Sequence, residues 1–148
     1  METIDSFAGD NFFLSNFYSC EVVFEGLKYP SSEHAYQAAK TLDSGQRRKI
    51  RSARSAGESK RLGRHVRLRK DWESIKYNVM VAILRDKFSR YEDLKKKLLA
   101  TGDAELIEGN GWGDKTWGCI RKNSSKPWIG KNWLGKALMQ VRSEINGI

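Results

Sequence analysis

The chain has 148 residues, and its 27 basic and 18 acidic side chains give it a net charge of +9. This length suits one domain with a sizeable core, so we expect a single domain over residues 1–148. No apolar run approaches the roughly 20 residues that span a bilayer, and residues 1–10 are polar and acidic, unlike a secretory signal; we therefore expect a soluble cytoplasmic protein with no membrane partner.

The first predicted elements are a hairpin and a helix. Alternation over Cys20–Phe24 predicts a strand, and Gly26 predicts a turn into a second strand over Leu27–Tyr29. A helix should begin near Ser31, because Ser31 or Ser32 can cap its first free amides.

The rest of the chain is mostly helical by its apolar spacing. Asp71 is a plausible N-cap for the longest helix, whose apolar stripe predicts burial in the core. The sequence therefore predicts an α+β fold, a single compact helix-rich domain with a small β component. The later elements are predicted as helices over Leu42–Ala53, Glu58–Gly63, Asp71–Ser89, Tyr91–Ala100 and Asn132–Ile145, and as a short strand over Glu105–Glu108.

The helix that starts near Ser31 carries a polar stripe. Glu33, Tyr36, Gln37 and Lys40 are spaced so that they share one helix face, and such a mixture of donors and acceptors can line a site. A glutamate in the first turn is also favoured by the helix dipole, so a purely structural role for Glu33 stays open.

A glycine-rich loop with two tryptophans spans Gly109–Gly118. Its glycines allow the backbone to approach a ligand closely, Trp112 and Trp117 offer stacking surfaces, and Asp114 is a candidate second carboxylate. Alternatively, the two tryptophans close the core over a turn.

Charge and the remaining polar residues give weaker signals. Residues 41–100 hold 18 basic and 7 acidic side chains, which favours nucleic acid or nucleotide phosphates as partners, although a solvated basic face explains the same pattern.

Asn16 follows a hydrophobic run, where a buried amide needs partners or a ligand. His34 should point to a different face from Glu33. Cys20 and Cys119 lack the spacing of a zinc site, so we expect free thiols, no metal and no cofactor.

The chemistry that these residues suit is bond cleavage at a sugar. The usual phosphate-loop, dinucleotide and zinc-protease motifs do not occur in the sequence. A carboxylate at position 33, a possible partner at Asp114, a lysine and stacking aromatics can stabilise the positive charge that develops at an anomeric carbon, or orient water there.

Several motifs in a fixed order are more specific than any of these signals alone. They are Leu14-Ser15-Asn16-Phe17, Tyr29-Pro30-Ser31-Ser32-Glu33-His34 leading to Gln37 and Lys40, Leu62-Gly63-Arg64, Arg69-Lys70-Asp71-Trp72, Gly109-Asn110 with Trp112-Gly113-Asp114, and Gly130-Lys131-Asn132-Trp133-Leu134-Gly135. With them the chain resembles, over nearly its whole length, the NADAR domain proteins, also called YbiA-like N-glycosidases.

That resemblance implies metal-independent hydrolysis of an N-glycosidic bond. The implied substrates are phosphorylated riboflavin-pathway intermediates, or ADP-ribose attached to guanine, including ADP-ribosylated nucleic acid. Carried over by motif, the catalytic residues are Glu33, Lys40 and Asp114, and Lys40 is open to three roles: phosphate binding, protonation of the leaving group or attack on the sugar. The implied substrate-binding residues are Ser15, Asn16, Phe17, His34, Tyr36, Gln37, Arg64, Trp72, Trp112, Gly113, Trp117 and Asn132.

One departure and two alternatives accompany this prediction. Ala35 stands where the family often has an aromatic residue, which puts the identity of the substrate in doubt. A noncatalytic module that binds ADP-ribose or nucleic acid would explain the basic segment and the tryptophan loop. A structural protein would simply satisfy the polar stripe inside its fold.

Overall fold

The computed structural model describes residues 2–147, which form two compact units. Unit 2 comprises Asn16–Glu92, and unit 1 comprises the described residues up to Ser15 and from Asp93 onward. The expectation of one domain over residues 1–148 stays a prediction. Within residues 2–147, helices that combine the length and the apolarity needed to cross a membrane are absent.

Unit 2 begins with the predicted hairpin. Strand β2 (Ser19–Phe24) pairs antiparallel with β3 (Leu27–Ser31), and Phe24 lies opposite Leu27. The two residues between them both have positive φ angles, 49° at Glu25 and 80° at Gly26. This is the backbone of a type I′ turn, whose twist matches that of the flanking strands.

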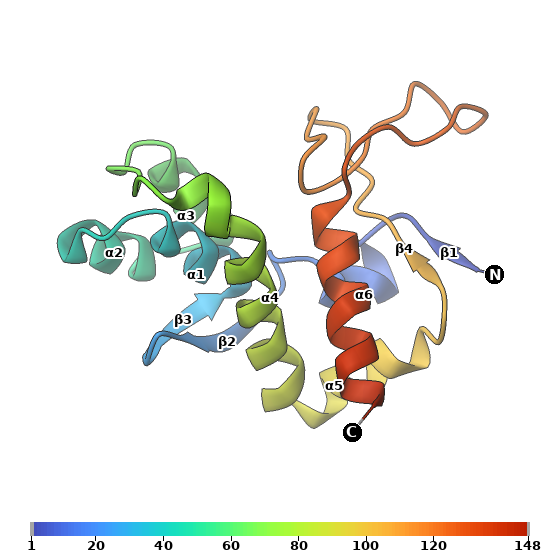
Figure 1. Ribbon diagram of the computed structural model, residues 1–148, viewed down its shortest axis with the longest axis horizontal. Coiled ribbons are helices and arrows are strands. Elements are labelled where there is room, and N and C mark those ends of the chain that lie inside the picture. The colour runs from blue at the N-terminus through green and yellow to red at the C-terminus, as the bar shows by residue number, and fades with distance from the viewer. Residues whose placement is uncertain (1, 148) are drawn as a thin grey trace. The chain divides into compact units, whose positions relative to one another are not determined.

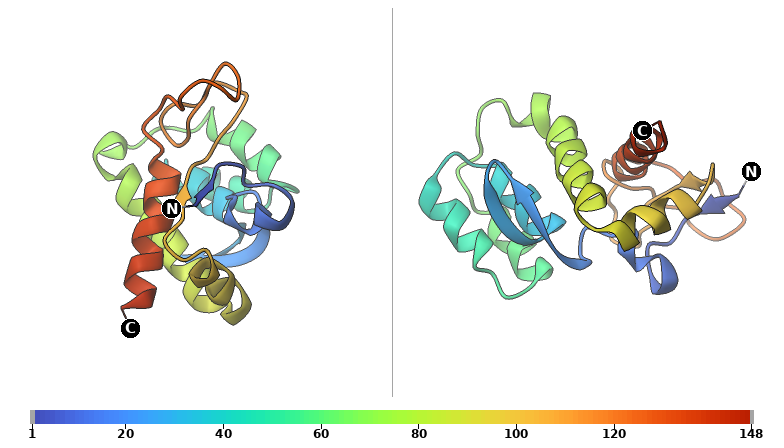
Figure 2. Two further views of the ribbon diagram at one scale, coloured as in Figure 1. Left: turned by 90° about the vertical axis from the view of Figure 1, so that its right-hand side faces the viewer. Right: turned by 90° about the horizontal axis from the view of Figure 1, so that it is seen from below.

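The helices of unit 2 surround a short buried helix. All eight residues of α1 (Ser32–Ala39) are buried, and α1 packs against the hairpin and three other helices, α2 (Ser44–Arg51), α3 (Ala56–Gly63) and α4 (Trp72–Arg90). The hairpin and α4 lie side by side in all views (Figure 1 and Figure 2). Complete burial of α1 means that its polar side chains must be paired inside the unit or serve a ligand.

Local capping decides where three of these helices begin. The side chains of Ser31, Asp43 and Ser55 each accept a backbone N–H three residues ahead, as N-cap residues do. Asp71 occupies the N-cap position of α4, but its side chain makes no capping bond. Its carboxylate instead accepts a hydrogen bond from Arg69 at 2.7 Å, so the predicted capping role of Asp71 is wrong although the start of the helix is right.

Unit 1 combines helices with a long non-helical segment over residues 107–132. It contains β1 (Thr3–Ile4), the 3-10 helix η1 (Gly9–Leu14), β4 (Glu105–Leu106) and α6 (Trp133–Asn146), as well as α5 (Glu92–Ala100) from its second residue onward. Strand β1 pairs in parallel with β4 (Figure 1). The predicted strand over Glu105–Glu108 corresponds to β4, which ends at Leu106. Strand β1 and its pairing with β4 were not predicted, because the two residues of β1 are too few to show a periodicity. Two small sheets among helices confirm the α+β class.

Candidate functional site

The predicted polar stripe of α1 is real, and it lies in the interior of unit 2. Glu33 and Gln37 are only 7% and 3% exposed. Gln37 Nε2 donates a hydrogen bond of 2.6 Å to Glu33 Oε2, and the Glu33 amide donates to the carbonyl of Asn16. A carboxylate removed from water must be held in this way, because burial penalises an unpaired charge.

Helix α3 holds this pair in place from the other side. A Cβ atom added at Gly63 would overlap Gln37 Oε1 and lie 2.7 Å from Gln37 Cδ. The backbone of α3 therefore packs directly on the Gln37 side chain, and position 63 has no room for any residue other than glycine unless Gln37 moves. The α1–α3 contact thus restricts the amide that orients Glu33.

Three buried oxygen atoms close to Glu33 in the sequence or the fold accept no hydrogen bond from residues 2–147. They are Asn16 Oδ1, Ser32 Oγ and Gln37 Oε1. Buried polar atoms without partners are uncommon in folded proteins and call for a ligand or ordered water. Gln37 binds the Glu33 carboxylate, Ser32 precedes Glu33 in the chain, and the Asn16 carbonyl accepts the Glu33 amide, so this part of unit 2 is a candidate binding site for a molecule with hydroxyl or amino groups.

The cationic end of the stripe is Lys40. Its Nζ lies 5.6 Å from the centroid of the Tyr36 ring, which in turn packs against Trp72 with 5.2 Å between centroids. Burial lowers the pKa of Lys40, and nearby cations, Lys60 among them, lower it further, whereas the Glu33 charge raises it. The lysine proton is therefore easier to remove than that of an exposed lysine.

His34 and Arg64 are two further predicted residues of unit 2. The His34 ring receives a hydrogen bond from Ser31 at Nδ1 and donates one from Nε2 to the carbonyl of Ala53, so both nitrogens serve the fold. This assignment follows because a carbonyl can only accept, and burial lowers the pKa of His34. Arg64 is exposed at the end of α3 and acts on Lys40 only through its charge.

The glycine-rich loop of unit 1 is organised by Asn110, a residue that the sequence analysis gave no separate role. Asn110 Oδ1 accepts the amides of Trp112 and Asp114, and its Nδ2 donates 2.9 Å to the Asp114 carbonyl. Asp114 Oδ1 accepts the amides of Thr116 and Trp117, both at 2.9 Å. One oxygen of this candidate catalytic carboxylate is therefore used to fold its own loop.

The two tryptophans of the loop have different environments. Trp117 packs edge-on against Trp133 at 5.7 Å between centroids, which fits the interpretation that it closes a core. Trp112 is 65% exposed and so does not close one. Gly113, between Trp112 and Asp114, has a φ of 88°, a conformation that favours glycine.

Asn132 has the clearest structural role among the predicted binding residues. It is 7% exposed and adopts a left-handed conformation with φ 54° at the start of α6. Its Oδ1 accepts the Glu108 amide at 3.0 Å and its Nδ2 donates to the Leu106 carbonyl at 2.8 Å. Both ends of the amide are thus bound to backbone groups near β4.

The predicted site residues therefore fall into two sets. Unit 2 holds Asn16, Phe17, Glu33, His34, Tyr36, Gln37, Lys40, Arg64 and Trp72, and unit 1 holds Ser15, Trp112, Gly113, Asp114, Trp117 and Asn132. Cys20 and Cys119 do not form a disulfide. Groups of three or more acidic, histidine or cysteine side chains suited to a metal ion do not occur within residues 2–147.

The sequence profile of the NADAR domain matches residues 6–146. The chain belongs to the NADAR domain family. Relatives of this NADAR domain include the N-glycosidase YbiA of Escherichia coli strain K12, 39% identical over 137 residues that cover 88% of this chain and 79% of the relative. A riboflavin biosynthesis protein of Vibrio vulnificus is 41% identical over 135 residues. That alignment covers 90% of this chain but only 35% of the longer protein.

A solved structure shares this NADAR fold. The NMR structure of E. coli YbiA superposes with a TM-score of 0.82 at 38% sequence identity, covering 99% of this chain and 87% of the other. The predicted family and the α+β fold class are confirmed by these matches. The E. coli relative carries the name N-glycosidase, and the V. vulnificus relative carries the name riboflavin biosynthesis protein.

Lys87 is a titratable residue of this NADAR domain that the sequence analysis missed. Its side chain is fully buried, and its Nζ lies over the rings of Phe88 and Tyr18 at 5.1 and 5.4 Å from the centroids. Burial lowers its pKa to about 8. The signal was available, because Lys87 follows Met80, Ile83 and Leu84 on the apolar side of α4.

Proposed function

We propose that this chain is a hydrolase that cleaves the N-glycosidic bond of a phosphorylated ribosyl substrate, with Glu33 as its catalytic carboxylate. The observation that carries the proposal is the buried Glu33 carboxylate held at 2.6 Å by Gln37 among unpartnered buried oxygens. A fixed negative charge in a dry environment stabilises the positive charge that develops at an anomeric carbon more strongly than it would in water. The same carboxylate can orient a water molecule for attack.

Lys40 is the second catalytic residue in this proposal. Its lowered pKa favours a role in which it loses or donates a proton over one in which it only attracts phosphate. The stripe would then supply a carboxylate for charge stabilisation and an amine for the leaving group or the sugar carbon. The variant Lys40→Arg separates these roles, because arginine keeps the charge for phosphate binding but cannot lose its proton at neutral pH.

Asp114 is proposed as the second carboxylate. Because its Oδ1 accepts two loop amides, only Oδ2 is available to a sugar hydroxyl or a water molecule. Asp114→Asn keeps an oxygen for the loop amides and removes the charge, so we expect it to reduce turnover without unfolding the loop.

The substrate class rests on the names of relatives and on charge. Relatives named N-glycosidase and riboflavin biosynthesis protein support a riboflavin-pathway intermediate, and the family resemblance adds ADP-ribosylated guanine. Exposed basic side chains on α2 and α3, such as Arg48, Lys49 and Arg61, would favour a phosphorylated molecule or modified nucleic acid. We also propose that the hydrolysis needs no metal ion and takes place in the cytoplasm. If no metal is needed, turnover should persist in EDTA.

The decisive experiment compares Glu33→Gln with wild type. We expect release of free base from a ribosylaminopyrimidine phosphate or from ADP-ribosylated guanosine to fall at least about a hundredfold, the scale for removing one preorganised electrostatic group. Glu73→Gln is the matched control, because Glu73 is an exposed carboxylate in the same unit that pairs with Lys76 one helix turn away. Its turnover should stay within twofold of wild type.

Two results would contradict the proposal. Turnover of Glu33→Gln within tenfold of wild type, in protein that unfolds at the same urea concentration, would remove Glu33 from the mechanism. Tight, salt-sensitive binding of ADP-ribosylated substrates without any released base would instead support the alternative, a noncatalytic binding module.

A further inference from the structure

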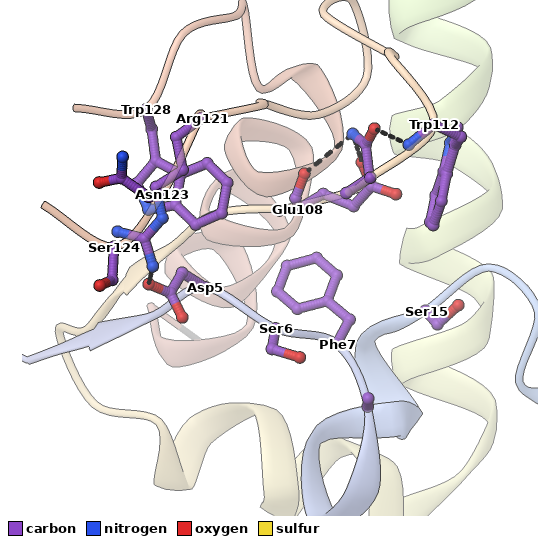
Figure 3. Close-up of a pocket in the computed structure, with 14 residues that line it drawn as sticks. Asp5, Ser6, Phe7, Ser15, Glu108, Trp112, Arg121, Asn123, Ser124 and Trp128 are labelled. Carbon is purple, nitrogen blue, oxygen red and sulfur yellow. Dashed lines mark hydrogen bonds and ion pairs between the residues drawn. The ribbon is translucent and has the colours of Figure 1, made fainter. Parts of the chain in front are cut away.

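A pocket of about 530 Å³ lies within unit 1, and neither Glu33 nor Gln37 lines it. Figure 3 shows the Phe7 ring in its middle, Trp112 on one side, and Arg121 and Trp128 on the other. Its size falls in the range of small-molecule sites, which run from about 300 to 1,000 Å³. None of the catalytic residues proposed above lines it.

One wall of the pocket is fixed by a stack of charged and aromatic groups. The Arg121 guanidinium lies 4.1 Å from the Trp128 ring centroid and pairs with Asp5 at 3.5 Å. A Cβ atom at Gly109 would lie 2.5 Å from Trp128 Cη2, so the backbone packs directly on this indole. The wall therefore presents a flat indole surface that packs against Arg121 and Gly109.

The opposite wall is Trp112. Its 65% exposure is unusual for the largest apolar side chain, yet its backbone amide is held by Asn110 Oδ1 at 3.2 Å. An exposed indole on an anchored loop loses little entropy when a ring stacks on it. Base–aromatic stacking is worth about 1 to 3 kcal/mol per base.

The charged side chains that line the pocket disfavour binding of a phosphate group. They are two carboxylates, Asp5 and Glu108, and one guanidinium, Arg121, so the net charge is negative. Glu108 can accept hydrogen bonds from amino and ring N–H groups, while Arg121 can donate to a carbonyl oxygen. A neutral planar heterocycle that carries both an exocyclic amine and a carbonyl matches this set.

We propose that the pocket formed by Phe7, Glu108, Trp112, Arg121 and Trp128 is a binding site for a neutral amino- and oxo-substituted heterocycle, stacked on Trp112 and recognised by Glu108. The ligand class rests on the proposed function, in which a base of this kind is the product released from the sugar. The residues themselves, apart from Trp112, belong to no motif that led to the family.

Calorimetric titration with isocytosine tests the site directly, because this soluble ring has one exocyclic amine and one carbonyl. We expect binding to the full chain with a Kd below about 1 mM and weaker binding of uracil, which lacks the amine, and of inorganic phosphate. Glu108→Gln should weaken isocytosine at least about tenfold, the effect of losing a hydrogen bond to a charged group. Trp112→Ala should weaken it between about fivefold and a hundredfold.

Matched controls lie in the same unit outside the pocket. Glu105→Gln removes an exposed carboxylate of β4, and Phe12→Ala removes an aromatic ring that is 41% exposed. Both should bind isocytosine as wild type does. The proposal is overturned if isocytosine does not bind, if uracil or phosphate binds as tightly, or if Glu108→Gln and Trp112→Ala behave like these controls.

Glu33→Gln separates this site from the proposed function. If that variant stops turnover while isocytosine still binds with the wild-type Kd, both proposals are supported. If it leaves turnover intact, the proposed function fails, and the base site is judged by the Glu108 and Trp112 titrations alone.

Discussion

Replacing Gly63 by alanine tests whether α3 positions the candidate carboxylate. Within a helix, alanine is usually favoured over glycine by about 1 kcal/mol. Here the added Cβ would overlap Gln37 Oε1, so the Gln37 side chain must move, and we expect this to disrupt its 2.6 Å hydrogen bond to Glu33. Gly63→Ala should therefore destabilise the folded state instead of stabilising it.

The size of the effect follows from these contacts. A hydrogen bond to a charged group contributes about 1.5 to 3 kcal/mol, and forcing atoms into a packed site costs about 1 to 3 kcal/mol. Helix propensity offsets up to about 1 kcal/mol of this. We expect Gly63→Ala to lower the free energy of unfolding by about 1 to 3 kcal/mol and to reduce turnover at least about tenfold, because Glu33 loses its orienting amide.

Urea unfolding of a double-mutant cycle with Gln37→Ala measures the contact itself. Without the Gln37 amide, the closest neighbour of the new methyl group would be the Cβ of residue 37 at 3.1 Å, a tight contact that a small shift relieves. Gly63→Ala should then cost less than about 1 kcal/mol. Gly57→Ala is the control on the same helix, since its Cβ would meet only Ser55 Oγ at 3.8 Å; it should be neutral or stabilising.

Equal costs of Gly63→Ala in the presence and absence of the Gln37 amide would refute this reasoning. So would wild-type turnover in Gly63→Ala, because the α1–α3 contact would then have no influence on Glu33.

Two further predictions concern buried polar groups. Because Lys87 has a pKa of about 8 when folded and about 10.5 when unfolded, its burial penalises the folded state fully below pH 8, and stability is regained as the pH rises towards 10.5. The free energy of unfolding of wild type, relative to Lys87→Met, should therefore rise by about 2 to 3 kcal/mol between pH 7 and pH 10 in urea titrations; a flat difference would show that Lys87 is not desolvated. Asn132→Ala leaves the Glu108 amide and the Leu106 carbonyl without partners, so it should lower the free energy of unfolding by about 2 to 5 kcal/mol; a loss below about 1 kcal/mol in urea unfolding would contradict the assigned role.

Features set by neighbouring residues were predictable from the sequence. The Glu25-Gly26 turn, the Ser31 cap and the polar face of α1 depend on residues at most four apart, and backbone preferences and helical spacing act over that range. The family was predictable too, because ordered motifs along the chain identify it without any knowledge of contacts.

Two features were not predicted correctly. Asp71 does not cap α4, because its carboxylate binds Arg69 two residues away instead, and capping preferences do not say which of two local partners a side chain takes. The β1–β4 pair was missed because it joins segments about 100 residues apart. The roles of the candidate site residues stay predictions, although the structure gives several of them definite contacts.

The sequence by itself determined which residues could form a site: a carboxylate, an amide, a lysine and aromatic rings at helical spacing. Only the tertiary structure decided their environment, because burial and steric fit depend on residues distant in the chain. It buried Glu33 beneath Gln37 and α3, buried Lys87, and bonded Asn132 to the backbone. It also left Trp112 exposed beside a pocket whose other walls come from Phe7 and residues 108–128, because a pocket requires segments that no local pattern relates.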